Sequence, residues 1–226
     1  MHVEIPCSKI RRFLAQQKPE VFIETLEKQK FFGVSKKPGV FLNMRTPKAV
    51  KKGLNTEQVL LDALAGESKA RVKYNLFASI ARKEGYEQIA AIFQETADNE
   101  LEHAKMILKL LGEVPKDTRE ALMKAIEGEH FEWTQMYPGF QKTASGEGED
   151  DAVKFFKEVA EVEMQHEARY KKLLESLQRN RLFKKDKVMK WKCRNCGYVH
   201  TEREAPAECP TCYHPKSYFE LQCENY

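Results

Sequence analysis

Residues 161–170 read EVEMQHEARY, and residues 99–108 read NELEHAKMIL. Both stretches contain a glutamate followed three positions later by a histidine: Glu163 with His166, and Glu100 with His103. Apolar residues recur around both pairs at the three- and four-residue spacing of an α-helix. Residues three apart lie on one side of a helix, so each pair presents a carboxylate and an imidazole together. One such pair is commonly a solvated surface, but two copies in one chain predict a metal site.

A carboxylate precedes each pair at a matching distance. Glu67 stands 33 positions before Glu100, and Glu129 stands 34 positions before Glu163, with Glu132 three positions after Glu129. Four antiparallel helices can therefore aim five carboxylates and two imidazoles at one point. Burying so many ionisable groups without partners is costly, and a pair of metal ions removes that cost. Carboxylate and imidazole ligands suit iron or manganese, and the arrangement is that of di-metal carboxylate bundles.

The hydrophobic periodicity predicts four long helices. The first runs from Thr56, a possible cap, and is closed by Gly85, and the second ends at Gly112. The third is expected to end or kink at Pro138. A polar loop is expected at residues 144–151, before the fourth helix. Helices of this length joined by short loops predict an antiparallel four-helix bundle.

The chain is expected to have three regions and to be mainly α-helical: a basic extension at residues 1–55, the bundle at residues 56–181, and a linker with a small metal domain at residues 182–226. The extension carries twelve basic and four acidic residues, whereas the remainder carries 26 basic and 30 acidic residues. A basic arm favours acidic partners, but no nucleic-acid-binding module is recognisable, and folding back onto the acidic body is the preferred interpretation. Targeting, dimer stabilisation and docking of a reductase are all compatible with this arm.

The last part of the chain carries two C-x2-C motifs separated by twelve residues. Such motifs present four thiolates to one ion, and a structural zinc ribbon or an iron centre has the same spacing. Thiolates that bind metal favour a reducing compartment, so we expect a cytoplasmic protein. No apolar run approaches the length needed to span a bilayer, and we expect no membrane partner. The four cysteines are Cys193, Cys196, Cys209 and Cys212.

The chain resembles the rubrerythrin family in four stretches: AGESKAR, NELEHAK, GEHFEWTQMYPGF and VEMQH. The resemblance implies a ferritin-like four-helix bundle with a non-haem di-iron centre. It also implies that Tyr74 and Tyr137 hydrogen-bond to ligating carboxylates. The ligands implied are Glu67, Glu100, His103, Glu129, Glu132, Glu163 and His166.

The cysteine-containing tail is similar to rubredoxin, with CGY at its first knuckle and a small aromatic core expected from Trp191, Tyr198, Tyr218 and Phe219. This similarity implies a mononuclear Fe(Cys)4 centre. Tyr213 follows the fourth cysteine, where rubredoxins commonly have a glycine that eases a positive φ. This departure puts the hydrogen bonds of the second knuckle in question.

Together these features imply a peroxidase of oxidative-stress defence that reduces hydrogen peroxide to water. Electrons would enter at the four-cysteine iron from an external donor, a rubredoxin or an NAD(P)H-dependent reductase. The chain itself lacks the G-x-G-x-x-G element of a nicotinamide site. The resemblance also implies a homodimer or higher homo-oligomer. Two alternatives stay open: a ferroxidase or iron-handling protein of the ferritin type, and a non-enzymatic module whose tail holds zinc.

Overall fold

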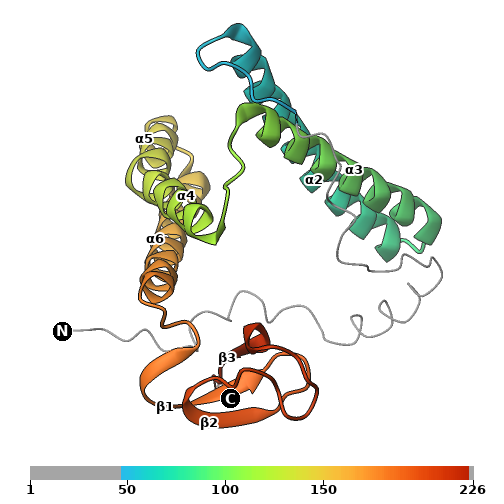
Figure 1. The fold of residues 1–226 in the computed structure, drawn as a ribbon. Coiled ribbons are helices and arrows are strands. Elements are labelled where there is room, and N and C mark those ends of the chain that lie inside the picture. Colours follow the sequence, from blue (N-terminus) through green and yellow to red (C-terminus); the bar gives the residue numbers. More distant parts are fainter. Residues whose placement is uncertain (1–46, 224–226) are drawn as a thin grey trace. The chain divides into compact units, whose positions relative to one another are not determined.

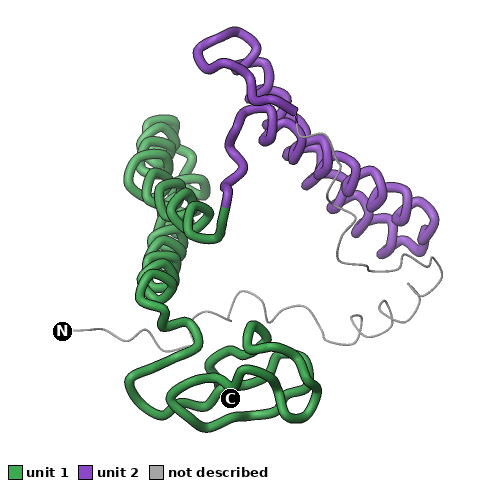
Figure 2. Tube along the Cα trace, in the orientation of Figure 1, with its two compact units in different colours: residues 1–35, 117–226 green, residues 36–116 purple. Residues whose placement is uncertain are grey.

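The computed structural model describes residues 47–223, and its helices form two hairpins followed by a small β-sheet domain (Figure 1). The described residues divide into two compact units at the Lys116–Asp117 bond (Figure 2). The first hairpin belongs to one unit, and the second hairpin and the sheet belong to the other. Most of the expected extension at residues 1–55 lies outside the described residues. None of the described helices is long and apolar enough to cross a membrane.

The first hairpin consists of α2 (Asn55–Lys83) and α3 (Glu87–Leu111). Gly85 and Gly112 follow these helices with φ of 84° and 71°, the left-handed conformation that glycine adopts without strain. Both predicted helix ends are therefore confirmed. The predicted cap at Thr56 is wrong, because α2 already begins at Asn55 after Leu54.

The second hairpin contains α4 (Thr118–Phe131), the π-helical turn η5 (Glu132–Met136), α5 (Tyr137–Glu147) and α6 (Asp150–Gln178). Asp117 caps α4 by accepting a hydrogen bond from the backbone N–H of Glu120 at 2.8 Å. Three segments thus replace the single third helix expected from the sequence.

Pro138 does not end this helix, so of the two predicted outcomes, a helix end or a kink, the helix end is wrong. The wide π-turn lies directly before it, and the N–H of Tyr137 bonds to the carbonyl of Glu132 five residues back. Pro138 then occupies the first turn of α5, where a missing N–H costs least. The helix continues to Glu147, so the polar loop predicted at residues 144–151 is also wrong. Only Gly148, with φ of 77°, and Glu149 separate α5 from α6.

The tail forms a three-stranded antiparallel sheet in the order β2–β1–β3. The strands are β1 (Lys184–Cys193), β2 (Val199–Glu204) and β3 (Phe219–Leu221), with the short 3-10 turn η6 (Lys216–Tyr218) before β3. Strand β1 therefore occupies most of the segment at the start of residues 182–226 that is expected from the sequence to be a linker. Pairing to β2, rather than local propensity, holds these lysine-rich residues extended.

A small core stabilises the tail. It contains Trp191, Cys193, Ala205, Cys209 and Phe219, and Tyr198 packs against it. The indole N–H of Trp191 donates to the carbonyl of Glu202 at 3.0 Å, which satisfies the buried donor. Tyr218 is 41% exposed and stacks edge-on against His214 instead, so its expected place in the core is wrong.

Candidate metal centres

Hairpin α2–α3 brings Glu67, Glu100 and His103 together. One donor atom from each lies within 4.8 Å of the others. The Nδ1 atom of His103 lies 2.8 Å from Oε2 of Glu100 and 3.8 Å from Oε1 of Glu67. The two residues three apart on α3 therefore meet the carboxylate that α2 supplies, as the helical spacing predicts.

Hairpin α4–α6 repeats this geometry with Glu129, Glu163 and His166. Nδ1 of His166 lies 2.6 Å from Oε2 of Glu163 and 3.6 Å from Oε2 of Glu129. The corresponding distances in the two hairpins differ by only 0.2 Å. The sequence duplication is thus a structural duplication as well.

Electrostatics within both clusters favour a bound cation. The hydrogen bond between the carboxyl groups of Glu67 and Glu100, together with desolvation and the Glu100 charge, raises the pKa of Glu67. Burial, and then a hydrogen bond with Glu163 and its charge, raises the pKa of Glu129. Two carboxyl groups this close favour keeping a proton, because two neighbouring negative charges repel each other. A bound metal ion offsets the same repulsion without the proton. The donor set therefore fits hard divalent or trivalent ions such as iron.

Glu132 and Tyr137 flank the second cluster at the two sides of the π-turn. Burial, followed by the charge of Glu163, raises the pKa of Glu132. Burial, followed by the charges of Glu132, Glu163 and Glu129, raises the pKa of the Tyr137 hydroxyl. Tyr137 therefore lies within electrostatic range of these carboxylates. Tyr74 lies in the other hairpin and stacks on Phe93 with ring centroids 6.2 Å apart, and its expected hydrogen bond to a ligand stays a prediction.

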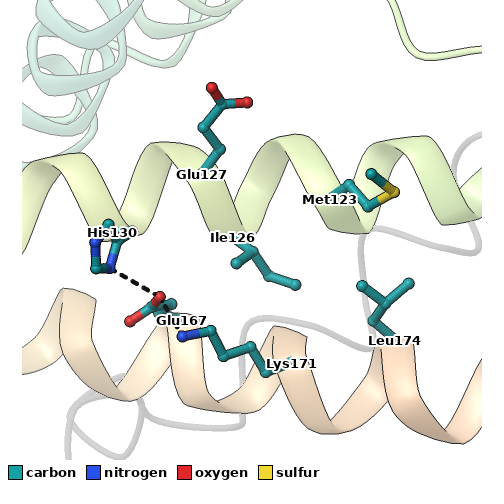
Figure 3. A pocket seen from close by; sticks show the side chains of 7 residues that line it. All are labelled: Met123, Ile126, Glu127, His130, Glu167, Lys171 and Leu174. Carbon is teal, nitrogen blue, oxygen red and sulfur yellow. Dashed lines mark hydrogen bonds and ion pairs between the residues drawn. The ribbon is translucent and has the colours of Figure 1, made fainter.

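Sequence reasoning missed a buried carboxylate next to His166. Glu167 is 5% exposed, and its side chain points from α6 towards α4 (Figure 3). Nε1–H of Trp133 donates to its Oε2 at 2.9 Å, while Nδ1 of His130 lies 3.0 Å and Nζ of Lys171 2.6 Å from its Oε1.

Burial raises the pKa of Glu167, but the hydrogen bonds from Lys171 and Trp133 outweigh it and lower the pKa below its ordinary value. Glu167 is therefore held as a carboxylate that ties the start of the π-turn to α6. A glutamate in a charged helix gives no signal of this, because the donor Trp133 lies 34 positions away.

The four cysteines of the tail converge as expected. Their sulfur atoms all lie within 4.8 Å, with Cys193 Sγ 3.7 Å from Cys212 Sγ and Cys196 Sγ 3.6 Å from Cys209 Sγ. An ion bound tetrahedrally by thiolates at about 2.3 Å requires sulfurs about 3.8 Å apart. The observed spacing thus fits one iron or zinc ion.

Backbone donors reach the sulfurs of both knuckles. Cys193 accepts hydrogen bonds from the backbone of Cys196 and Asn195, and Cys209 accepts them from Thr211 and Cys212. Burial raises the pKa of the Cys209 thiol, but these donors outweigh it and bring the pKa to about 7. The second knuckle therefore keeps its hydrogen bonds.

Tyr213 follows the fourth cysteine with φ of 57°, and Gly197 follows the second cysteine with φ of 80°. The left-handed turn is thus preserved at both knuckles, although a tyrosine adopts it at a cost.

Fold and site together define a class of protein: a ferritin-like helical domain that carries two carboxylate–histidine clusters, followed by a rubredoxin-like metal domain. Comparisons with known proteins agree. The family model described as rubrerythrin matches residues 58–174, and that described as the rubredoxin-like domain of rubrerythrin matches residues 191–220. The chain belongs to the rubrerythrin family.

Two curated relatives match over nearly their whole length. Rubrerythrin-1 of Clostridium acetobutylicum is 44% identical over 77% of this chain and 98% of its own. Rubrerythrin of Porphyromonas gingivalis is 46% identical over 77% of this chain and 94% of its own. A solved structure of nigerythrin in a mixed-valence state is 33% identical, with a TM-score of 0.29, and covers 80% of this chain and 92% of that one.

Family membership confirms the expected fold class, a ferritin-like four-helix bundle followed by a small rubredoxin-like domain with four cysteine ligands. It also confirms the expected cofactors, a non-haem di-iron centre and a mononuclear four-cysteine iron. The family is one of oxidoreductases. The expected domain boundaries and the roles of the individual site residues stay predictions.

Proposed function

We propose that this chain is a peroxidase that reduces hydrogen peroxide to water for oxidative-stress defence. The observation that carries the proposal is the presence, in one chain, of two matched carboxylate–histidine clusters and a four-thiolate cluster. Reduction of hydrogen peroxide to two waters consumes two electrons and two protons. A di-iron pair supplies both electrons when bound, and a four-cysteine iron replaces them one at a time.

The ligands of the di-iron pair in this proposal are the two clusters together with Glu132. Glu132 begins the π-turn, and such turns inside α-helices are frequent at functional sites. Its raised pKa suits it to take up and release a proton near the metals. Tyr137 would orient the carboxylates on which its hydroxyl pKa depends. The proposed ligands are Glu67, Glu100, His103, Glu129, Glu132, Glu163 and His166.

Electrons are proposed to enter through the tail from an external donor, a rubredoxin or an NAD(P)H-dependent reductase. Cys196 and Cys212 are accessible to solvent, whereas Cys193 and Cys209 are buried. An iron bound there is therefore close to the surface on one side, which suits transfer to and from partner proteins. The working form is proposed to be a homo-oligomer of at least two chains in a reducing compartment such as the cytoplasm.

An anaerobic titration tests this function. Protein purified with its native metals is assayed for iron and zinc, reduced fully and mixed with one equivalent of hydrogen peroxide or of oxygen. We expect about three irons per chain, an iron–thiolate absorbance near 490 nm, and fast reoxidation by peroxide but slow reoxidation by oxygen. Glu100→Ala should abolish fast reoxidation.

A matched variant on the same helix controls this test. Glu102→Ala removes a glutamate that is 68% exposed and pairs with Lys105, and it should leave reoxidation unchanged. Zinc in the tail, or iron that is oxidised and accumulates beyond the site stoichiometry, would instead indicate the ferroxidase alternative.

A further inference from the structure

The two hairpins differ at two positions near their clusters. Glu132, at the start of the π-turn, is matched in α2 by Ala70, and α2 is an unbroken α-helix at this point. The facing helix differs as well. Directly after its cluster histidine, α6 carries the buried Glu167, whereas α3 carries Ala104. The hairpin with the additional carboxylate and the π-turn is therefore also the one with a buried glutamate.

These differences point to one role for Glu167. We infer that Glu167 is a positioning residue, which fixes Glu132 in its place beside α6. It acts through hydrogen bonds to the residues around Glu132 and does not itself touch a metal ion. The inference rests on the proposed function, because Glu132 is one of the ligands proposed there.

Both oxygens of the Glu167 carboxylate reach across to the junction of α4 and η5. Nε1–H of Trp133 donates to Oε2 at 2.9 Å, and Nδ1 of His130 lies 3.0 Å from Oε1. The side chains of His130 and Glu167 point toward each other from the two helices (Figure 3). A carboxylate only accepts hydrogen bonds, so Nδ1 of His130 carries the proton in this pair. Glu167 therefore holds two points of the chain that lie three residues apart.

The two held residues alternate with proposed ligands along the chain. His130 directly follows Glu129, and Trp133 directly follows Glu132. Neighbouring side chains on an α-helix point about 100° apart, so the held pair and the ligand pair lie on adjacent faces of the same segment. A rotation of this segment about its axis would displace Glu132 and would break both hydrogen bonds at the same time.

The donor groups that both hairpins share form their cluster without such a glutamate. In the first hairpin Nδ1 of His103 lies 2.8 Å from Glu100 and 3.8 Å from Glu67. The corresponding distances in the second hairpin differ by only 0.2 Å. Among the proposed ligands, Glu132 is the only one without a counterpart in the first hairpin. Its placement is therefore what the hydrogen bonds of Glu167 serve.

Packing alone does not explain a glutamate at position 167. Glu167 is 5% exposed, and a buried carboxylate costs free energy unless hydrogen bonds satisfy it. Ala104 fills the matching position of α3 without this cost. The partners that satisfy Glu167 lie on both sides of Glu132 in the sequence. Hydrogen bonds of this kind around a metal site orient its ligands.

Binding of Fe(II) to the full-length chain tests the inference without an activity assay. A chelator removes iron from the helical sites, and Fe(II) is titrated back under anaerobic conditions. The iron–thiolate absorbance confirms that the tail stays loaded. Trp133→Phe removes the hydrogen bond to Glu167 but no charge and no proposed ligand. It should weaken Fe(II) binding by about 10–100-fold, the loss typical of removing a residue that orients a ligand.

The same substitution in a Glu132→Ala background separates positioning from a general loss of structure. Without Glu132 the hydrogen bond has no ligand to position, so Trp133→Phe should then change the affinity by less than about twofold. Glu167→Gln, measured in both backgrounds, gives the same comparison from the other side of the hydrogen bond. Helical circular dichroism checks that each variant is folded.

Two controls lie in the same hairpin. Lys171→Met removes a partner of Glu167 on its own helix, 2.6 Å away, and leaves the hydrogen bonds to the π-turn segment in place. Ala144→Gly weakens the buried face of α5 and lowers its helix propensity. Both variants should bind Fe(II) at least as tightly as the wild type, although Ala144→Gly should lower the Tm.

The wild type, titrated in parallel, reports on the proposed function. If it takes up no iron at the helical sites, that function fails and the inference fails with it. If it does take up iron there, any of three results overturns the positioning role alone. Trp133→Phe binds as tightly as the wild type, or it loses as much affinity without Glu132 as with it, or a control variant weakens binding equally. A loss confined to chains that contain Glu132 supports the inference.

Discussion

Replacing Glu167 by glutamine tests how much the buried carboxylate stabilises the second hairpin. The substitution keeps the size of the side chain but removes its charge. Most of the stabilisation that is lost comes from the hydrogen bond of Trp133, whose Nε1–H donates to the carboxylate at 2.9 Å. A hydrogen bond to a charged group contributes about 1.5–3 kcal/mol. Lys171 and His130 are 57% and 54% exposed and can bond to water, so they add little.

We therefore expect Glu167→Gln to lower the free energy of unfolding by about 2 kcal/mol. For a chain of this size that corresponds to a fall in Tm of about 4–8 °C. The assay is thermal unfolding of the metal-loaded protein, followed by helical circular dichroism at one fixed protein concentration. Concentration and metal content are held constant because both shift the apparent Tm.

A neighbour on the same helix serves as the matched control. Glu175 pairs with Arg179 at 2.9 Å, but its side chain is 56% exposed. Glu175→Gln should therefore cost below about 0.5 kcal/mol. In addition, Trp133→Phe should cost less in the Glu167→Gln background than in the wild type, because the two side chains interact directly. Equal Tm values for Glu167→Gln and Glu175→Gln would show that the buried carboxylate of Glu167 does not stabilise the second hairpin more than an exposed one does.

Three further predictions concern the metal sites and the tail. Because burial and neighbouring carboxylates raise the pKa of Glu129 and Glu132, these groups take up protons at a higher pH than free glutamates do, and uptake of Fe(II) by metal-free protein should weaken as the pH falls. Iron retained after gel filtration measures this, and uptake independent of pH would contradict it. Tyr213→Gly should stabilise the tail by up to about 1 kcal/mol, because relief of the left-handed strain exceeds the added entropy of glycine. A lower temperature for thermal loss of the iron–thiolate absorbance would count against this. Trp191→Phe should cost about 1–3 kcal/mol, because it removes the hydrogen bond to the carbonyl of Glu202 and leaves part of the space of the fully buried indole unfilled. A lower denaturant midpoint for the same absorbance measures this, and an unchanged midpoint would contradict it.

The sequence by itself determined the helical hairpins and the groups that meet in each of them. Spacings of three along a helix depend only on helix geometry, so Glu100 with His103 and Glu163 with His166 followed directly. The glycines after α2 and α3 ended both helices for a reason local to the backbone. The convergence of the four cysteines on one metal site was also predicted, because each C-x2-C motif fixes the geometry of its own two thiolates.

Tertiary structure decided the features that depend on distant partners. The π-turn carries the chain past Pro138, which local rules place at a helix end. Pairing with β2 turned the lysine-rich stretch before Trp191 into strand β1. Burial of Glu167 required partners from α4 and η5 that no periodicity of α6 reveals. In each case contacts with residues far along the chain outweighed the local preference. A sequence pattern reports only local preferences.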